Sequence, residues 1–296
     1  MYWTAFADTR HGLISLADPK TPCPNEVCTF FVQASSDGGR SWSTTLRGSV
    51  QTNGRAQLEA TPGSSVVRAY FPCGPPACRP QLYRSSDWGR RWRLVGYPRL
   101  LRMRFWSPRD GWGLTNNHEV VATHDGGRSW RRVAKQPCDG NDQLGVGPVA
   151  VAPVSSRHGW VLCNDGRMVE QAAAIVETRD GAHSWRYRAI KGSPTQHVGR
   201  GVLNLFALLD LSFSSNGRGW IWRFAGRPLR TPDGGRSWLP AAGWPFPRNT
   251  YSVTWGSAVS ETQAFALVTR LERPTVLLRT SDGGRSWAIV HRWARP

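Results

Sequence analysis

The apolar residues of this chain fall in short segments separated by turn sequences rich in glycine, aspartate and serine. No apolar run approaches the 18 residues of a membrane-spanning helix. Short apolar segments bounded by turn residues are typical of β-strands joined by tight turns. The pattern therefore predicts an all-β chain, beginning with a strand at its first residues.

One octapeptide occurs six times, in copies 38 to 55 residues apart. Its pattern is Ser or Thr, any residue, Asp, Gly, Gly, Arg, Ser and Trp. A fixed repeat of this length indicates a repeat architecture. The aspartates and tryptophans of the six copies are Asp37, Asp87, Asp125, Asp180, Asp233, Asp282, Trp42, Trp92, Trp130, Trp185, Trp238 and Trp287.

The octapeptide has the chemistry of a tight hairpin turn. Its aspartate can accept hydrogen bonds from backbone N–H groups of the turn, and its glycines can adopt the positive φ that a chain reversal requires. Its tryptophan is expected to open the next strand and to bury its ring against the blade. Trp88 replaces the first glycine in one copy, and Ala182 with His183 replaces Gly-Arg in another. We expect these two turns to be the most strained, and we assign the six aspartates a structural role at the outer rim.

A second turn precedes each octapeptide and is followed by glycine and an aromatic or apolar residue, as in Phe105–Trp112. Each repeat then contains four short strands, which is the content of a propeller blade. The sequence predicts a single six-bladed β-propeller over residues 1–296. We place the blades at approximately 1–48, 49–98, 99–136, 137–192, 193–243 and 244–296. No strand is left over to complete another blade.

The octapeptide resembles the Asp box, or bacterial neuraminidase repeat, of sialidases, sortilin-type receptors and xyloglucan hydrolases. The sequence Gly-Trp followed by Thr-x-Asp-Gly-Gly-x-Ser-Trp is most similar to the propellers of photosystem II assembly and stability factors and their bacterial relatives. The resemblance covers the whole chain. It implies the propeller fold, but it says little about function, because one fold serves many functions.

The six cysteines fall in local pairs without the spacing or histidine partners of a zinc site. They predict three disulfides, pairing Cys23 with Cys28, Cys73 with Cys78 and Cys138 with Cys163. Disulfides persist in oxidising compartments. We therefore expect an extracellular or cell-envelope protein whose export signal or anchor is not part of this sequence.

The formal net charge is +18, and nearly all the basic residues are arginine. A strongly basic chain raises the question of nucleic-acid binding, but the arginines are dispersed and five recur at one position of the octapeptide. We therefore favour weak attraction to acidic surfaces over nucleic-acid binding. No cofactor or metal site is predicted, and we expect a monomer.

In the predicted topology, the loops between second and third strands share one face with the connections between blades. All six cysteines fall on this face, which we call the loop face. Loops stiffened on one rim suggest a surface that receives a ligand. We predict a non-catalytic propeller that binds a protein, peptide or glycan there. The candidate binding residues are Asp139, Asn141, Asp142, Asn164, Asp165, Arg167, His197 and Arg200.

A glycoside hydrolase of the sialidase type is the alternative. That resemblance implies an arginine triad around a carboxylate and a Tyr–Glu nucleophile pair. Tyr251, Arg200, Arg223 and Arg248 are the candidates. The Arg-Ile-Pro signature expected in the first blade is absent, and no convincing pair of carboxylates can be chosen. The sequence therefore favours the binding function.

Overall fold

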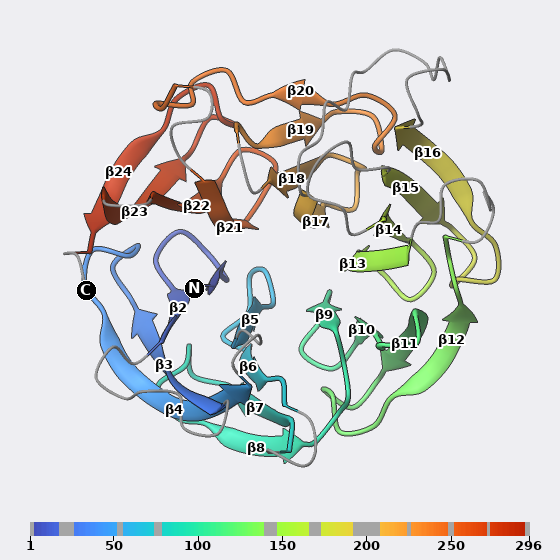
Figure 1. The fold of residues 1–296 in the computed structure, drawn as a ribbon, viewed down its shortest axis with the longest axis horizontal. Coiled ribbons are helices and arrows are strands. Elements are labelled where there is room, and N and C mark those ends of the chain that lie inside the picture. The colour runs from blue at the N-terminus through green and yellow to red at the C-terminus, as the bar shows by residue number, and fades with distance from the viewer. Residues whose placement is uncertain are drawn as a thin grey trace.

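The structure is a computed structural model that describes residues 3–17, 27–51, 56–73, 79–138, 147–165, 173–191, 208–223, 226–247, 252–270 and 273–293. These residues form six antiparallel four-stranded sheets around a central axis (Figure 1). Within each sheet, consecutive strands are neighbours. The prediction of a six-bladed propeller with four strands per blade is confirmed. None of the described segments forms a helix long and apolar enough to span a membrane.

The strands of the first three blades follow the chain in order. They are β1 (Trp3–Phe6), β2 (Gly12–Ala17), β3 (Val27–Ser35) and β4 (Ser43–Gln51); β5 (Gln57–Ala60), β6 (Val67–Phe71), β7 (Gln81–Ser85) and β8 (Arg93–Gly96); and β9 (Arg102–Phe105), β10 (Gly111–Leu114), β11 (Glu119–Thr123) and β12 (Arg131–Lys135).

The remaining three blades repeat this arrangement. Their strands are β13 (Gly147–Pro153), β14 (Gly159–Asn164), β15 (Ala173–Thr178) and β16 (Arg186–Lys191); β17 (Leu208–Phe213), β18 (Gly219–Arg223), β19 (Leu229–Thr231) and β20 (Leu239–Pro240); and β21 (Ser252–Ala258), β22 (Ala264–Arg270), β23 (Arg273–Thr280) and β24 (Ala288–Arg292). The first strand of each blade lies nearest the axis and the fourth lies at the rim (Figure 1).

Each octapeptide forms the turn between the third and fourth strands, and its aspartate holds the turn together. In blade 3, Asp125 Oδ1 accepts hydrogen bonds from the backbone N–H groups of Arg128 and Ser129 at 2.9 and 3.0 Å. Asp125 Oδ2 accepts a bond from the Ser129 hydroxyl at 2.6 Å, and the Thr123 hydroxyl donates to Oδ1 at 2.8 Å. The bond between this Ser or Thr hydroxyl and the aspartate recurs in all six copies. The aspartate carboxylates are therefore occupied by hydrogen bonds within their own turns.

The tryptophan of the octapeptide lies one residue before the fourth strand rather than opening it. In three copies its indole N–H donates to the carbonyl of the second glycine of its own turn. In those three copies the bond ties the ring to its own turn, whereas the fourth strand begins one residue after the tryptophan in all six copies.

Two of the octapeptide turns adopt a positive φ at a residue other than glycine, at the two positions where the sequence lacks one. Trp88 has φ of 63° and Ala182 has φ of 75°, a region that costs a residue with a Cβ atom roughly 1–2 kcal/mol. The Trp88 ring stacks on His11 of blade 1 with centroids 4.0 Å apart. Ala182 is buried against residues of blade 3. Contacts with a neighbouring blade thus accompany the strain in both turns.

A backbone hydrogen bond joins each octapeptide to the first turn of its own blade. The residue after the aspartate donates its N–H to a carbonyl of the first turn at 2.8 to 3.0 Å in all six blades. The bonds run from Gly38 to Arg10, Trp88 to Ser65, Gly126 to Arg109, Gly181 to Arg157, Gly234 to Gly217 and Gly283 to Thr262. The two kinds of turn therefore share one face, which we call the octapeptide face, opposite the loop face.

Among the described residues, the hydrophobic core comprises six clusters. Five of them lie between two adjacent blades, and the other joins blades 1 and 2 and also includes Trp255 of blade 6. The second glycine of the octapeptide marks this junction. A Cβ atom on Gly127 would lie 2.7 Å from Leu82 Cδ2 of blade 2, and one on Gly39 would lie 2.5 Å from Leu277 Cδ2 of blade 6. Both contacts are closer than van der Waals packing allows, so a side chain at these positions would push the blades apart.

Side-chain packing closes the ring between blades 6 and 1. Phe6 and Phe265 stack with ring centroids 3.5 Å apart, and Trp3 packs on Trp255. The Phe6 N–H donates to Ser257 Oγ at 2.9 Å. Because each sheet contains only consecutive strands, no strand is shared across this junction.

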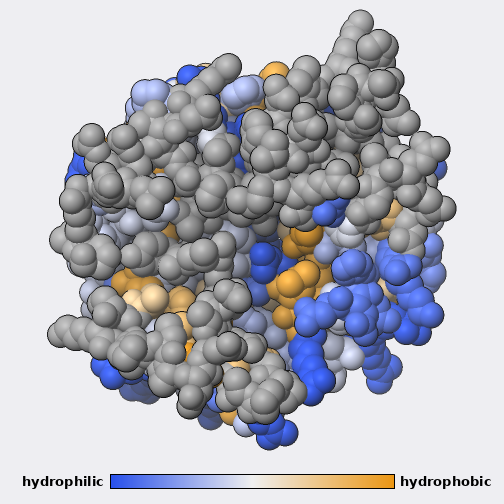
Figure 2. All heavy atoms as spheres, in the orientation of Figure 1, coloured by the Kyte–Doolittle hydropathy of each residue, from blue (hydrophilic) through white to orange (hydrophobic). Residues whose placement is uncertain are grey.

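The fourth strands are the exposed edges of the sheets. In β12, Arg131, Arg132 and Lys135 are exposed, and Figure 2 shows hydrophilic surface over this strand, with apolar atoms nearer the axis. Charged side chains on an edge strand oppose pairing with another chain. Part of the basic charge therefore protects the rim of the propeller.

We predict that Gly127→Ala destabilises the protein by about 2–4 kcal/mol, since it adds the cost of positive φ to overpacking against Leu82. Urea unfolding followed by tryptophan fluorescence measures the change. Ala182→Gly is the matched control, because it relieves φ strain but removes one buried methyl group, and we expect a change within about 1 kcal/mol. Wild-type stability in Gly127→Ala would contradict the packing account.

We predict that the contribution of Asp125 to stability is lost in acid. Desolvation acts to raise its pKa, but hydrogen bonds from Ser129, Thr123 and Arg128 outweigh it and lower the pKa. A carboxyl whose pKa is lowered by folding stabilises the folded state above its unfolded pKa, about 3.9, and this effect fades as the pH falls. The difference in unfolding free energy between wild type and Asp125→Asn should shrink as the pH drops from about 5 to about 2. A pH-independent difference would refute this role.

Candidate functional site

A disulfide lies on the loop face at blade 4. Cys138 and Cys163 are bonded, with Cα atoms 6.0 Å apart, and both residues are buried. The bond ties the connection that enters blade 4 to the end of β14. The predicted pairing of these two cysteines is confirmed.

The other cysteines are described only in part. Cys28 and Cys73 are each disulfide-bonded, and no described cysteine is free. Their predicted partners, Cys23 and Cys78, lie outside the described residues. Those two pairings stay predictions.

The predicted binding residues are also described only in part. Asn164, which is buried, ends β14, and Asp165 follows it at the loop face, beside the disulfide. The other candidates lie outside the described residues: Asp139, Asn141, Asp142, Arg167, His197 and Arg200. The structure therefore positions one edge of the predicted surface.

Of the residues named for the glycosidase alternative, only Arg223 is described. It ends β18, and burial lowers the pKa of its guanidinium. Tyr251, Arg200 and Arg248 lie outside the described residues. The predicted catalytic set stays a prediction.

A cavity of about 290 Å³ lies at the axis on the octapeptide face. Its lining includes the last residue of the innermost strand in five of the six blades: Ala60, Phe105, Pro153, Phe213 and Ala258. Trp106 and the hydroxyl-bearing Ser212 and Ser257 also line it. Arg104 lines it as well, so the cavity combines apolar surface with a charged group and several hydroxyl groups, a mixture suited to a small ligand or a side chain of a partner.

An ion pair crosses the axis beside this cavity. Arg104 on β9 contacts the carboxylate of Asp210 on β17, which links blades 3 and 5 without passing through blade 4. Asp210 is almost completely buried and also accepts the N–H of Leu211 at 2.9 Å. Its negative charge is therefore compensated within the protein.

A second buried pair lies between blades 2 and 3. Arg68 Nη1 is 3.2 Å from Glu59 Oε2, and Phe105 donates its N–H to Glu59 Oε1 at 3.1 Å. Burial raises the pKa of Glu59, while Arg68 and Arg104 oppose the shift. Burial lowers the pKa of Arg68 to about 10, against the attraction of Glu59.

These two pairs limit the chemistry of the axial cavity. The buried carboxylates of Glu59 and Asp210 each have an arginine partner. Among the described residues at the axis, both of these carboxylates therefore contact a cationic side chain.

The axial residues Glu59, Arg104 and Asp210 are not among the site residues predicted from the sequence. Glu59 and Arg104 each lie one position before the end of their innermost strand. Because successive residues of a β-strand point to opposite sides, each has the same place in its strand and the same side of its sheet. Polar residues at such positions are a recognisable signal in a propeller. The turn pattern alone does not reveal it.

Comparison with known proteins supports the fold alone. No family model matches the chain, and no curated protein matches it. Among solved structures, the chain is similar to the Aleuria aurantia lectin in complex with Fucalpha1-6GlcNAc, with a TM-score of 0.57, 9% identity, and 98% of this chain and 94% of that chain covered. It is also similar to the GH74 xyloglucanase from Xanthomonas campestris, with a TM-score of 0.56, 18% identity and 98% of this chain covered.

The match covers 47% of the xyloglucanase chain, so this protein spans about half its length. A further neighbour is YCF48 bound to D1 peptide, with a TM-score of 0.48, 15% identity, and 97% of this chain and 79% of that chain covered. At these identities the lectin and the xyloglucanase share only a fold with this chain. The comparisons thus place it among β-propellers.

Proposed function

We propose that this chain is a non-catalytic, exported or cell-surface β-propeller that binds a protein, peptide or glycan on its loop face. Its six octapeptides are Asp boxes under this proposal. The observation that carries it is the Cys138–Cys163 disulfide, which holds two chain segments together on that face.

The state of the cysteines supports export. All described cysteines are disulfide-bonded, and structural disulfides are rare in reducing compartments. A disulfide also limits the motion of the loops that it joins, which lowers the entropy that a binding surface loses when it meets its ligand. Asp165 follows the disulfide-bonded strand directly and is suited to contribute to such a surface.

The axial residues support a role without catalysis. Glu59 and Asp210 are held by arginines, so they do not provide the pair of available carboxyl groups that glycoside hydrolysis needs. The glycosidase alternative depends on Tyr251, Arg200, Arg223 and Arg248. Turnover of a fluorogenic sialoside that is lost in Tyr251→Phe would establish it instead.

We predict that replacing Cys138 and Cys163 with serine lowers the free energy of unfolding by about 2–4 kcal/mol, since the cross-link constrains the unfolded chain. Thermal or urea unfolding of the purified double variant measures the loss. Peptide mapping of the unreduced wild type is the accompanying control and should also show the Cys23–Cys28 and Cys73–Cys78 pairs. An unchanged free energy of unfolding would show that the Cys138–Cys163 bond does not stabilise the fold.

We predict that substitutions on the loop face weaken ligand binding and that substitutions on the octapeptide face do not. A glycan array and a peptide array probed with wild type identify the strongest binder. The Asp165→Ala/Arg167→Ala double variant should bind it at least about tenfold more weakly, which is the loss expected from one charge-assisted contact. Arg90→Gln, on the octapeptide face, is the control and should bind normally. Undiminished binding by the double variant would reject the loop-face assignment.

A further inference from the structure

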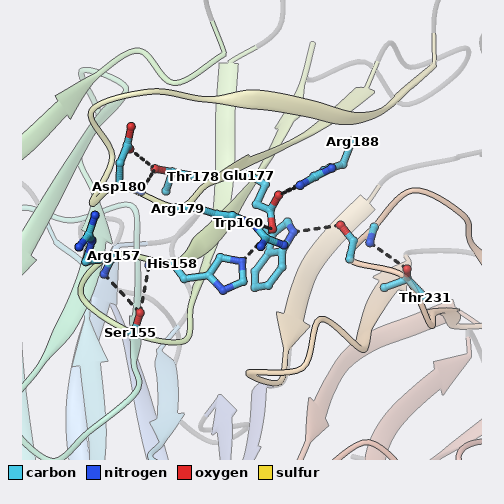
Figure 3. A network of polar contacts seen from close by, with 12 residues as sticks. Ser155, Arg157, His158, Trp160, Glu177, Thr178, Arg179, Asp180, Arg188 and Thr231 are labelled. Atoms are coloured by element: carbon cyan, nitrogen blue, oxygen red, sulfur yellow. Dashed lines mark hydrogen bonds and ion pairs between the residues drawn. The ribbon is translucent and has the colours of Figure 1, made fainter.

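A buried carboxylate between blades 4 and 5 contacts two arginines and a histidine. Glu177 on β15 is 1% exposed, and its Oε1 lies 2.8 Å from His158 Nε2 and 3.0 Å from Arg179 Nε. Arg188 on β16 contacts Oε2 (Figure 3). Desolvation acts to raise the pKa of Glu177, but hydrogen bonds from His158 and Arg188 and the charges of Arg188 and Arg179 lower it. Glu177 is therefore ionised and fully engaged.

The cationic groups line a pocket of about 360 Å³ on the octapeptide face. Blade 4 contributes His158, Arg179 and Arg188, and the octapeptide of blade 5 contributes Arg236. The remaining lining belongs to blade 5: Ser215, Asn216, Gly217, Asp233 and Gly234. The pocket adjoins the axial cavity, with which it shares Ser215, and lies on the face opposite the loop face.

The second carboxylate of the pocket is also engaged. Asp233 Oδ1 accepts the backbone N–H groups of Arg236 and Ser237 at 3.0 and 2.9 Å, and its Oδ2 accepts the Ser237 hydroxyl at 2.6 Å. Its acceptor groups are directed into its own turn. Two carboxylates thus face three arginines and a histidine, and the pocket carries net positive charge.

The arginines keep donors for a further partner. Arg179 contacts Glu177 through Nε, and Arg188 does so through Nε and Nη2. This leaves both terminal nitrogens of Arg179 and Nη1 of Arg188. Within the described part of the chain, the Arg236 guanidinium has no hydrogen bond or ion pair. Guanidinium groups present their N–H donors in a fork that matches the oxygens of an anion.

The propeller repeat supplies an internal comparison. The residue equivalent to Glu177, just before the octapeptide, is not acidic in the other five blades: Ala34, Arg84, Ala122, Arg230 and Arg279. The residue equivalent to Arg188, three positions after the tryptophan, is uncharged in all five: Thr45, Val95, Val133, Ala241 and Val290. The blade fold therefore forms without this cluster, and its presence in blade 4 calls for another explanation.

We propose that this pocket binds a tetrahedral oxyanion, phosphate or sulfate, either free or as a monoester. Three guanidinium groups meeting in one pocket suit an anion with at least three oxygens, whereas a planar carboxylate is satisfied by one fork. The volume exceeds what one small ion fills, so a group that carries the oxyanion can enter as well. This inference does not rest on the loop-face function, because the pocket lies on the other face.

Isothermal titration calorimetry with sodium phosphate, sodium sulfate and sodium acetate tests the site, at constant ionic strength because salt screens exposed charges. Wild type should bind phosphate or sulfate more tightly than acetate. Arg236→Gln should weaken that binding at least about tenfold. This variant leaves the contacts of Glu177 intact, so its melting temperature should equal that of wild type. Arg236→Lys should restore part of the affinity.

Arg90→Gln is the matched control. Arg90 occupies the octapeptide position of Arg236, but its junction is with blade 1, where Trp92 Nε1 donates to Thr45, the equivalent of Arg188. Binding of phosphate or sulfate should be unchanged in this variant. An equal loss in both variants, acetate binding as tight as phosphate, or no oxyanion binding by wild type would each overturn the proposal.

Glucose 6-phosphate and glucose 6-sulfate identify the source of the anion. Tighter binding of an ester than of its free anion assigns the site to a monoester, and weaker binding assigns it to the free ion. If the oxyanion occupies this pocket, Arg236→Gln must weaken the binding of both the esters and the free anions, and Arg90→Gln must leave it unchanged.

Discussion

The contact between each octapeptide turn and the preceding blade is the constraint on which the whole ring depends. At the second glycine of three turns, Gly39, Gly89 and Gly127, a Cβ atom would lie within 2.7 Å of a leucine of the preceding blade, whereas blade 4 packs the Cβ atom of Ala182 at the equivalent position. The aspartate fixes the shape of the turn, and a backbone bond ties the turn to its own blade. Six such turns bring six sheets together face to face, and the apolar clusters form between them. Ring closure by Phe6 and Phe265 uses the same packing, without an exchanged strand.

Because the backbone is set by the repeat, the individuality of the protein lies in side chains that depart from it. Blade 4 illustrates this with Ala182 in a glycine position and with the Glu177 cluster. Blades 3 and 5 do so with Arg104 and Asp210, which meet across the axis. Each departure places a charged or bulky group where neighbouring blades supply its partner. A repeat protein thus gains local chemistry at little cost to its architecture.

The positions of the acidic residues change how the net charge of the chain is interpreted. Although the net charge is +18, the buried carboxylates at the axis and in blade 4 are each held by arginine. The octapeptide aspartates are occupied by their own turns. Nine of the twenty acidic residues are therefore engaged in these contacts, and the 38 lysines and arginines far outnumber the other eleven. The two faces divide the remaining features, with the disulfide on the loop face and both cavities on the octapeptide face.

The sequence by itself determined the number of blades, the turn in each blade and the strained turns at Trp88 and Ala182, because these depend on local hydrogen bonding and on φ. It also predicted the Cys138–Cys163 bond, since simple strand topology brings both residues to one face. Only the tertiary structure decided which distant side chains meet. Arg104 and Asp210 are 106 residues apart, and their contact depends on how far each inner strand lies from the axis. Similarly, Arg236 joins Arg188 in one pocket only because blades 4 and 5 pack at a particular angle, which the sum of the apolar contacts between them sets.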